Sequence, residues 1–123
     1  MPPHDPGTAS VAEVARHWAV SPPTARRILA DAGLPRANEE GWARYRWADV
    51  WRLEGEAYVP PHLWKAFRAP LLSPEQAVAS DPRGRSGRTL RRLRAAGRLP
   101  EIRLAPSIRR MRALVLEEGA VYA

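Results

Sequence analysis

The first apolar pattern in the chain has the spacing of an amphipathic helix. Ser10 and Glu13 form a capping box in front of it, since each side chain can satisfy the backbone N–H of the other. The apolar residues lie at i, i+3, i+4 and i+7: Val11, Val14, Ala15 and Trp18. A second helical pattern starts after Ser21, a typical N-cap, and ends at Gly33. We therefore expect two helices joined by a short turn.

The spacing then changes from helical to alternating. Residues 39–41, Glu-Glu-Gly, are typical of a turn, and residues 42–47 alternate so that Trp42, Arg44 and Arg46 share one side of a strand. Residues 49–55 return to helical spacing, with Val50 and Leu53 facing inward. Residues 1–55 thus predict a unit of three helices with a small β wing.

The helical pattern recurs 65 residues later in the chain. Residues 24–35 and 89–100 share the core T-x-R-R-aliphatic-x-A, and both end in Leu-Pro. Ser73 and Ser86 are positioned as caps of two further helices, over residues 75–80 and 86–96. A reduced wing is expected over residues 101–105, and Pro106 is expected to open a final helix through Glu118. The inward residues of that helix would be Ile108, Met111, Leu114 and Val115. Residues 73–123 therefore predict a second unit of the same kind.

A proline-rich segment, residues 56–72, separates the two units. Pro60, Pro61 and Pro70 surround one short apolar turn that contains Trp64 and Phe67. This composition predicts a hinge with one short helix. The two aromatic side chains either pack between the units or mediate self-association or contact with a partner protein, because an exposed aromatic pair favours aggregation.

The composition is that of a globular protein. Of 123 residues, 45% are apolar and five are Trp, which is too apolar for a disordered basic tail. The chain has no Cys, which excludes disulfides, thiolate zinc sites, iron–sulfur clusters and cysteine nucleophiles. No apolar run approaches the roughly 20 residues of a membrane helix, and the first residues lack the order of a signal peptide. We expect a cytoplasmic protein with no membrane partner.

The positive charge is concentrated in the second half of the chain. The net charge is +7 and the isoelectric point about 11.1, yet residues 1–55 have no net charge. Between residues 83 and 112 there are eleven Arg and one acid, Glu101, which favours nucleic-acid binding over a solvated helix face with alternating signs. Of the 20 basic residues 19 are Arg, whose planar fork suits phosphates and guanine, although a GC-rich genome would also produce this bias.

These elements together describe a winged helix-turn-helix. The motif S-x-x-T-aliphatic-R-R-aliphatic occupies residues 86–93, and a related version occupies residues 21–28. Gly and Leu-Pro follow in both copies, and Tyr-Arg-Trp-Ala-Asp-Val at 45–50 has the form of a wing exit and third helix. In these features the chain resembles the MerR-like, excisionase-type helix-turn-helix family. The resemblance covers most of the chain, once per unit. It implies a mainly α fold with small β wings, in two tandem winged helix-turn-helix units.

The resemblance also implies DNA-binding residues in both units. In the second unit, side chains that contact bases, phosphates or the DNA backbone would be Ser86, Arg88, Thr89, Arg91 and Arg92, with Arg94 and Arg103 as flanking cations. In the first unit the matching residues are Thr24, Arg26 and Arg27, with Arg44 and Arg46 on the wing. Pro22 and Pro23 stand where the second unit has Gly87 and Arg88. The first unit therefore either binds DNA weakly or contacts a protein.

We expect sequence-specific binding to double-stranded DNA in the nucleoid, by a transcription regulator or a recombination directionality factor. Helix 86–96 would enter the major groove, where Arg can donate two hydrogen bonds to guanine. The alternative is a protein-interaction module, such as an anti-activator or a partner-docking protein. It is favoured by Pro22, Pro23 and the neutral first unit. RNA binding is less favoured, since no RNA-module motif is present.

No pattern indicates an enzyme, a cofactor or a metal site. The three His are scattered, and the adjacent acidic pairs at 39–40 and 117–118 point in different directions, which does not suit acid–base catalysis. Trp47 and Trp51 are expected in the core. Trp42 fits either the core or stacking on a base.

Overall fold

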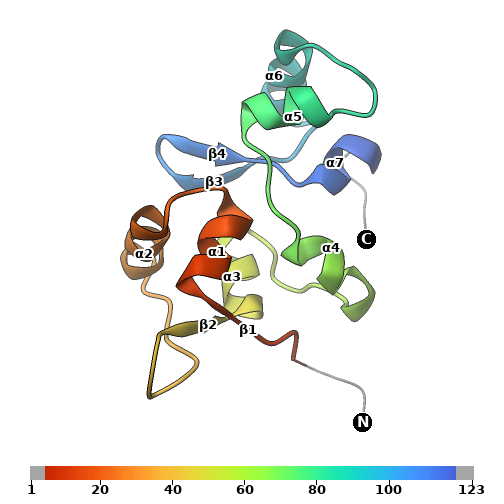
Figure 1. Ribbon diagram of the computed structural model, residues 1–123. Helices are drawn as coiled ribbons and strands as arrows, with labels where there is room; N and C mark the ends of the chain where they lie inside the picture. Colours follow the sequence, from red (N-terminus) through yellow and green to blue (C-terminus); the bar gives the residue numbers. More distant parts are fainter. Residues whose placement is uncertain (1–4, 119–123) are drawn as a thin grey trace. The chain divides into compact units, whose positions relative to one another are not determined.

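The structure, a computed structural model of the chain, describes residues 5–118. The chain divides into two compact units, unit 1 (Met1–Pro70) and unit 2 (Leu71–Ala123). Each unit consists mainly of helices and contains a small antiparallel sheet of two strands (Figure 1). The prediction of a mainly α protein with small β elements is confirmed. The expected ends of the two units, residues 1–4 and 119–123, lie outside the described residues.

Unit 1 begins with a strand that leads directly into a helix. Its elements are β1 (Thr8–Ser10), α1 (Val11–Trp18), α2 (Pro22–Asp31), β2 (Arg44–Arg46), α3 (Trp47–Leu53), the 3₁₀ turn η1 (Pro61–Leu63) and α4 (Trp64–Arg68). The positions of α1 and α2 agree with the two helices predicted from the apolar spacing. The third helix begins at Trp47, two residues earlier than expected.

Side-chain caps fix where α1 and α2 begin. Ser10 Oγ accepts the Glu13 N–H at 3.1 Å, and Glu13 Oε1 accepts the Ser10 N–H at 3.0 Å, which completes the predicted capping box. Ser21 Oγ accepts the Thr24 N–H at 3.3 Å. Between the helices the chain turns at Ala19, whose φ of +56° lies in the left-handed region. The helix pair of unit 1 is therefore specified by short-range polar contacts.

The sheet of unit 1 differs from the predicted wing. Alternation over residues 42–47 predicted one strand, but only Arg44–Arg46 forms β2, and Trp47 already belongs to α3. The strand pairs antiparallel with β1, where Ala9 lies opposite Tyr45. Because β1 is only three residues long and its partner is far away in the sequence, local spacing did not reveal it.

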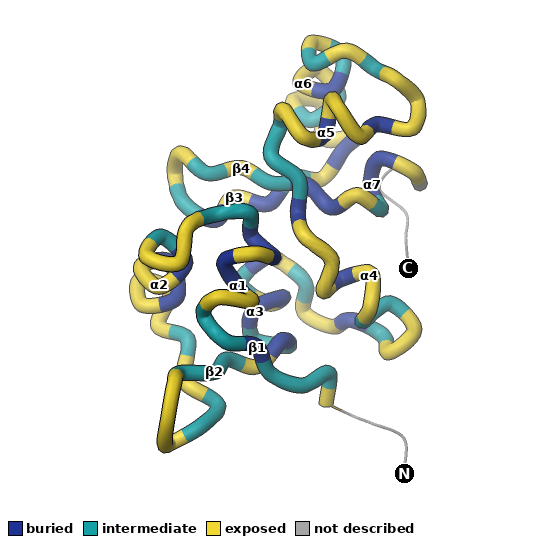
Figure 2. The backbone as a smooth tube through the Cα atoms, viewed as in Figure 1, coloured by how far each residue is buried: buried dark blue, intermediate teal, exposed yellow. Residues whose placement is uncertain are grey.

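The loop before β2 is closed by Asn38, which explains why the strand is short. Asn38 Nδ2 donates to the carbonyls of Glu40 and Trp42, both at 2.8 Å, and Asn38 Oδ1 accepts the Arg44 N–H at 2.9 Å. These bonds close residues 39–43 into a loop, and pairing with β1 begins only at Arg44. The loop is mostly exposed (Figure 2), and the Trp42 side chain is 92% exposed.

Aromatic rings form the core of unit 1. Trp47 stacks on Trp51 with ring centroids 5.7 Å apart, and Phe67 meets Trp51 edge-on at 6.0 Å. The prediction that Trp47 and Trp51 lie in the core is confirmed. Trp42, which was left open, lies outside the core.

The segment expected as a hinge, residues 56–72, belongs mostly to unit 1, which ends at Pro70. Phe67 is only 2% exposed, and its carbonyl accepts the indole N–H of Trp51 at 3.0 Å. Trp64 donates its indole N–H to the Val59 carbonyl at 2.8 Å. The segment is part of unit 1 because Phe67 packs against Trp51 and accepts its indole N–H. Phe67 is therefore a core residue of unit 1.

A buried histidine and a buried glutamate join α1, α3 and the end of unit 1. His17 Nδ1 lies 2.8 Å from the Ala69 carbonyl oxygen, which only accepts, so Nδ1 carries a proton. His17 Nε2 lies 2.7 Å from Glu54 Oε2, and the Trp18 indole donates to the same oxygen at 2.7 Å. One proton lies between Nε2 and Oε2, so His17 and Glu54 together have no net charge. A neutral pair of this kind is compatible with burial.

Unit 2 is built on a similar helix pair. Its elements are α5 (Pro74–Ser80), α6 (Gly87–Ala95), β3 (Ile102–Ala105), β4 (Ile108–Arg110) and α7 (Ala113–Glu118). Ser73 caps α5 together with Gln76, and Ser86 caps α6, as predicted.

The predicted final helix of unit 2 is wrong in its first half. Pro106 and Ser107 form the turn of a hairpin between β3 and β4, and α7 begins only at Ala113. Strand pairing continues beyond β4, because the backbones of Met111 and Leu72 exchange hydrogen bonds of 2.8 and 2.9 Å. Ile108–Arg110 is therefore held as a strand by β3, and the pairing of Met111 with Leu72 extends it by one residue.

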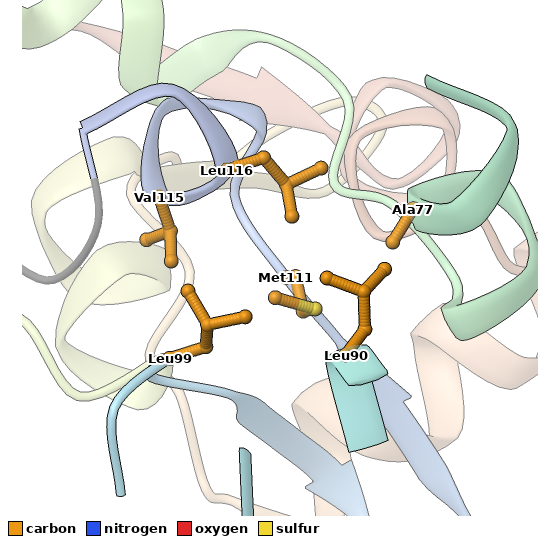
Figure 3. Close-up of a cluster of buried hydrophobic side chains, with 6 residues drawn as sticks. All are labelled: Ala77, Leu90, Leu99, Met111, Val115 and Leu116. Carbon is orange, nitrogen blue, oxygen red and sulfur yellow. The ribbon is translucent and has the colours of Figure 1, made fainter. Parts of the chain in front are cut away.

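Apolar side chains from the three helices and from the segments on either side of the hairpin form the core cluster of unit 2 (Figure 3). The fully or nearly buried members are Ala77, Leu90, Leu99, Met111, Val115 and Leu116. Of the four inward residues predicted for the last helix, Met111 and Val115 are buried, whereas Ile108 and Leu114 are half-buried. Leu116, which was not predicted, completes the cluster.

Replacing Glu54 tests the buried polar pair. Glu54→Ala removes the acceptor of Trp18 and leaves His17 Nε2 without its partner, so the free energy of unfolding of unit 1 should fall by about 3 kcal/mol. All five Trp lie in unit 1, so denaturant unfolding followed by Trp emission reports on this unit alone. Glu40→Ala, in the exposed loop, is the control and should change little. Equal effects of the two substitutions would contradict the assigned role.

Candidate nucleic-acid interface

One face of α6 carries three exposed arginines. Arg88, Arg91 and Arg92 are spaced i, i+3 and i+4, so they lie on the same side of the helix. Leu90 and Leu93 lie on the opposite side and pack in the core cluster or against it. Within residues 5–118 none of the three guanidinium groups has a hydrogen-bond or ion-pair partner. Their charge is available to a ligand.

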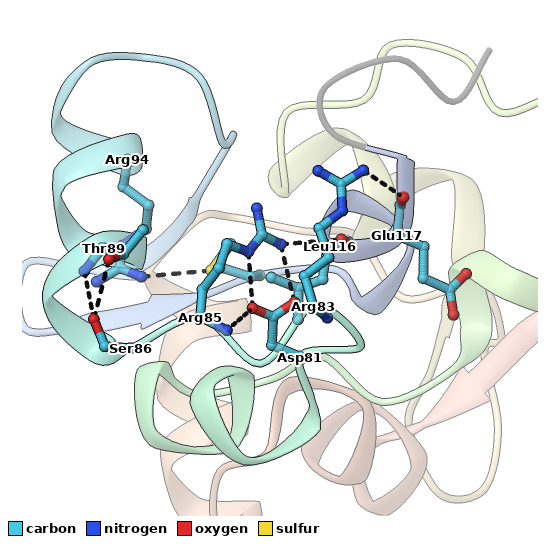
Figure 4. A network of polar contacts seen from close by, with 9 residues as sticks. Asp81, Arg83, Arg85, Ser86, Thr89, Arg94, Leu116 and Glu117 are labelled. Carbon is cyan, nitrogen blue, oxygen red and sulfur yellow. Dashed lines mark hydrogen bonds and ion pairs between the residues drawn. The ribbon is translucent and has the colours of Figure 1, made fainter.

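Two other predicted residues, Ser86 and Thr89, form the cap of α6 (Figure 4). Ser86 Oγ accepts the Thr89 N–H at 3.2 Å and lies 3.0 Å from Thr89 Oγ1. Both residues are partly or fully exposed at the start of the helix. They fix the first turn, and with it the position of Arg88.

Arg94 was predicted with the other arginines of α6 but lies on the inner side of the helix. Its side chain is only 11% exposed, and Arg94 Nε lies 3.5 Å from Glu101 Oε2. Its Nη1 lies 3.6 Å from the sulfur of Met111. The Glu101 carboxylate also approaches Arg103 Nη2 at 3.8 Å. Arg94 therefore connects α6 to the start of β3 and is mostly withdrawn from solvent.

The β3–β4 hairpin adds two arginines that face each other. Arg103 and Arg109 are direct cross-strand partners, and both are exposed. Like charges in this position repel each other, which destabilises a hairpin unless an anion lies between or near them. Arg109 also lines one groove together with Arg91 of α6 and Glu75 of α5. The hairpin and the helix thus form a joint cationic surface.

Arg109 was not among the predicted site residues. Residues 106–118 were interpreted as one helix, which placed Arg109 away from the wing. The sequence contains a signal that would have corrected this: Pro-Ser at 106–107 suits a tight turn, and apolar and basic residues alternate in part after it.

The turn before α6 is held by a buried ion pair. The Asp81 side chain is fully buried and accepts hydrogen bonds from Arg85 Nε at 2.8 Å and Arg85 Nη2 at 2.9 Å (Figure 4). It also accepts the backbone N–H groups of Arg83 and Arg85. Arg85 Nη2 bonds to the Leu116 carbonyl at 3.1 Å. This network fixes the direction in which α6 leaves the turn.

The Asp81 carboxylate remains ionised in acid because of these bonds. The hydrogen bonds from the Arg85 side chain, opposed by burial and helped by the two backbone N–H groups, hold the pKa of Asp81 well below its usual value. A lowered pKa means that the carboxylate stabilises the folded unit only while it is charged.

The corresponding face of unit 1 is less basic. Arg26 and Arg27 are exposed on α2 and have no partner within the described residues, but Pro23 stands in the place of Arg88. Thr24 shares in the Ser21 cap, with its Oγ1 2.9 Å from Ser21 Oγ.

The two predicted wing residues of unit 1 lie in different environments. Arg44 is turned toward β1: its Nε donates to Thr8 Oγ1 at 2.8 Å, and its Nη2 donates to the Thr8 carbonyl at 3.0 Å and approaches Glu13 at 3.5 Å. Arg44 therefore holds the sheet together. Arg46 is exposed at the other end of β2.

Comparisons with known proteins found no match. No protein-family model matches the chain. No curated protein and no solved structure is significantly similar to it. Within residues 5–118, no helix combines the length and apolarity that crossing a bilayer needs, and no three metal-ligating side chains gather in one place.

Replacing Asp81 tests the turn. Asp81→Asn should lower the free energy of unfolding of unit 2 by about 2 kcal/mol at pH 7, because the charged acceptor of Arg85 is lost. The stabilisation by Asp81 is present above the pKa of about 3.9 that an unfolded Asp has, and is lost as the pH falls through the lower folded pKa. The difference between wild type and variant, measured by far-UV circular dichroism, should therefore shrink below about pH 4.

Trp emission provides the internal control for this variant, since unit 2 contains no Trp. The unfolding of unit 1 should not change. A difference of the same size at pH 7 and at pH 2 would mean that the charge of Asp81 does not hold the turn.

Proposed function

We propose that the protein binds double-stranded DNA in a sequence-specific manner, chiefly through unit 2. Each unit would be a winged helix-turn-helix, with α1–α2 and α5–α6 as the helix pairs and the small sheets as wings. The proposal rests above all on Arg88, Arg91 and Arg92, which lie unpaired on one exposed face of α6. A helix of this size fits the major groove, where an Arg fork can bind the O6 and N7 atoms of guanine.

The charges around α6 support the same proposal. Unit 2 has eleven Arg and five acids, and two of these acids, Asp81 and Glu101, have Arg partners inside the unit. The start of α6 adds the backbone N–H groups of Gly87 and Arg88, which suit a phosphate. The arginines of the β3–β4 hairpin would contact the DNA backbone beside the groove. Such a protein would act in the nucleoid, as a transcription regulator or a recombination directionality factor.

A paired substitution in α6 tests this function. Sequences bound by the full-length protein are first selected from a random duplex pool, and the affinity for the best sequence is measured by gel shift. Arg91→Ala with Arg92→Ala should weaken specific binding by roughly 100-fold, since each Arg contact with a base contributes about 1–3 kcal/mol. Arg16→Ala, an exposed arginine of α1, is the control. No enrichment from the pool, or an affinity that both variants share with wild type, would refute the proposal.

Arg109 provides a second test, because it should have opposite effects on binding and on stability. Arg109→Ala removes one phosphate contact, so the slope of log affinity against log salt should fall by about 1 without a change in the preferred sequence. The same substitution removes the repulsion from Arg103, so the free protein should be as stable as wild type or more stable. Lower stability together with unchanged DNA binding would assign Arg109 to the fold instead.

A further inference from the structure

Both units contain a groove in the same place, but the chemistry of the two grooves differs. In unit 2 the groove between α5, α6 and β4 contains Glu75, Gly87, Arg91 and Arg109. In unit 1 the groove between α1, α2 and the loop before β2 contains Val11, Ala12, Pro22, Arg26, Trp42 and Ala43. The internal repeat aligns Arg26 with Arg91 and Pro22 with Gly87, and the caps Ser10 and Ser73 align Ala12 with Glu75. The grooves are therefore equivalent, and their difference points to different ligands.

The start of α2 lacks the donors that a phosphate requires. Pro22 and Pro23 occupy its first two positions and have no backbone N–H. The next N–H, that of Thr24, is already bonded to Ser21 Oγ. In unit 2 the same positions are Gly87 and Arg88, which supply two N–H groups and one guanidinium. Unit 1 therefore lacks these two N–H groups and this guanidinium, which in unit 2 favour an anion at the start of the helix.

The wall of the groove in unit 1 is apolar and well fixed. Trp42 and Ala43 form the side that Arg109 forms in unit 2. The Trp42 side chain is 92% exposed, but its backbone carbonyl accepts a hydrogen bond from Asn38, and Arg36 Nη2 donates to the neighbouring Gly41 carbonyl at 2.8 Å. An exposed Trp on a loop that is held by hydrogen bonds is typical of a protein-contact residue. Trp and Arg are enriched among the residues that contribute most of the binding energy in protein interfaces.

Positive charge borders this apolar surface. Arg26 lines the groove, and both Arg26 and Arg27 lack a partner within residues 5–118. The carboxylate at the start of α1, Glu13, is bonded to the Ser10 N–H, which lowers its pKa, and lies 3.5 Å from Arg44. Glu39 and Glu40 do not line the groove. A ligand here would meet apolar walls and one cation without a partner, Arg26.

We propose that this groove binds an acidic segment of a partner protein, with one large apolar side chain against Trp42 and Pro22 and a carboxylate on Arg26. The occupant is a protein rather than DNA because the same positions that provide phosphate donors in unit 2 are Pro or apolar residues in unit 1. The inference does not depend on DNA binding by unit 2. Where both hold, the protein connects a partner protein to a DNA site.

Peptide selection with a matched variant tests the proposal. Random 12-residue peptides displayed on phage are selected on the immobilised full-length protein and counter-selected on full-length Trp42→Ala. The variant retains unit 2, so the counter-selection removes peptides that bind the basic surface of that unit. The recovered peptides should combine Asp or Glu with one Leu, Phe or Trp.

Affinities of the recovered peptides, labelled with fluorescein, are then measured by anisotropy. Trp42→Ala should weaken binding by at least about tenfold, and Arg26→Ala should weaken it less, and only when the peptide acids are present as carboxylates. Tyr58→Ala is the control, since Tyr58 is exposed and lies outside the groove. Circular dichroism should show all three variants folded.

Two results would overturn the proposal. One is the absence of any peptide that survives counter-selection, or peptides that bind wild type and Trp42→Ala equally. The other is a loss of duplex affinity in Trp42→Ala as large as that in the double variant Arg91→Ala with Arg92→Ala, which would make the groove a nucleic-acid surface. A failure of duplex binding by the wild type refutes only the function proposed for unit 2.

Discussion

The hydrogen bonds around the buried Asp81 carboxylate determine how unit 2 presents its charge. They hold the turn before α6 and bind Arg85 internally, so the helix starts in a fixed direction. Glu101 likewise forms an ion pair with Arg94 on the inner side of α6. With these two arginines neutralised, the arginines on the outer face remain without partners. The surface of unit 2 is thus defined by where its few acids lie rather than by the number of its arginines.

The two units hold a similar helix pair by different means. When the caps of α1 and α5 are aligned, Trp18 of unit 1 corresponds to Asp81 of unit 2. Trp18 is buried and donates to Glu54, whereas Asp81 binds an arginine of its own turn. Likewise, buried Leu29 corresponds to Arg94. Unit 1 depends on an aromatic core extended by residues 56–70, and unit 2 depends on aliphatic packing and ion pairs. The two units therefore differ in their cores as well as in their exposed residues.

The sequence predicted the features that depend on near neighbours. The caps at Ser10, Ser21, Ser73 and Ser86, and the helices that follow them, are local and were found. Strand β1 was missed because its partner, β2, is far away in the sequence, whereas β4 was missed because the turn at residues 106–107 was interpreted as the start of a helix.

The sequence also did not reveal which way each arginine side chain points. Arg44 and Arg94 have the same formal charge as Arg26 and Arg91, but Thr8 and Glu101 draw them inward. Charge counting along the chain cannot separate an arginine bound to the fold from one that is available. Arg109 was misplaced for another reason, because the turn of the β3–β4 hairpin at residues 106–107 was interpreted as the start of a helix.

The opposed arginines of the β3–β4 hairpin link the lifetime of the folded protein to its surroundings. Arg103 and Arg109 repel each other across the hairpin, and the Glu101 carboxylate, which lies 3.8 Å from Arg103 and is shared with Arg94, offsets this cost only in part. Any polyanion that binds the native but not the unfolded chain removes this cost and shifts the folding equilibrium by mass action. Unit 2 would then open less often when bound than when unbound, and a cellular protease would degrade bound molecules more slowly than idle ones.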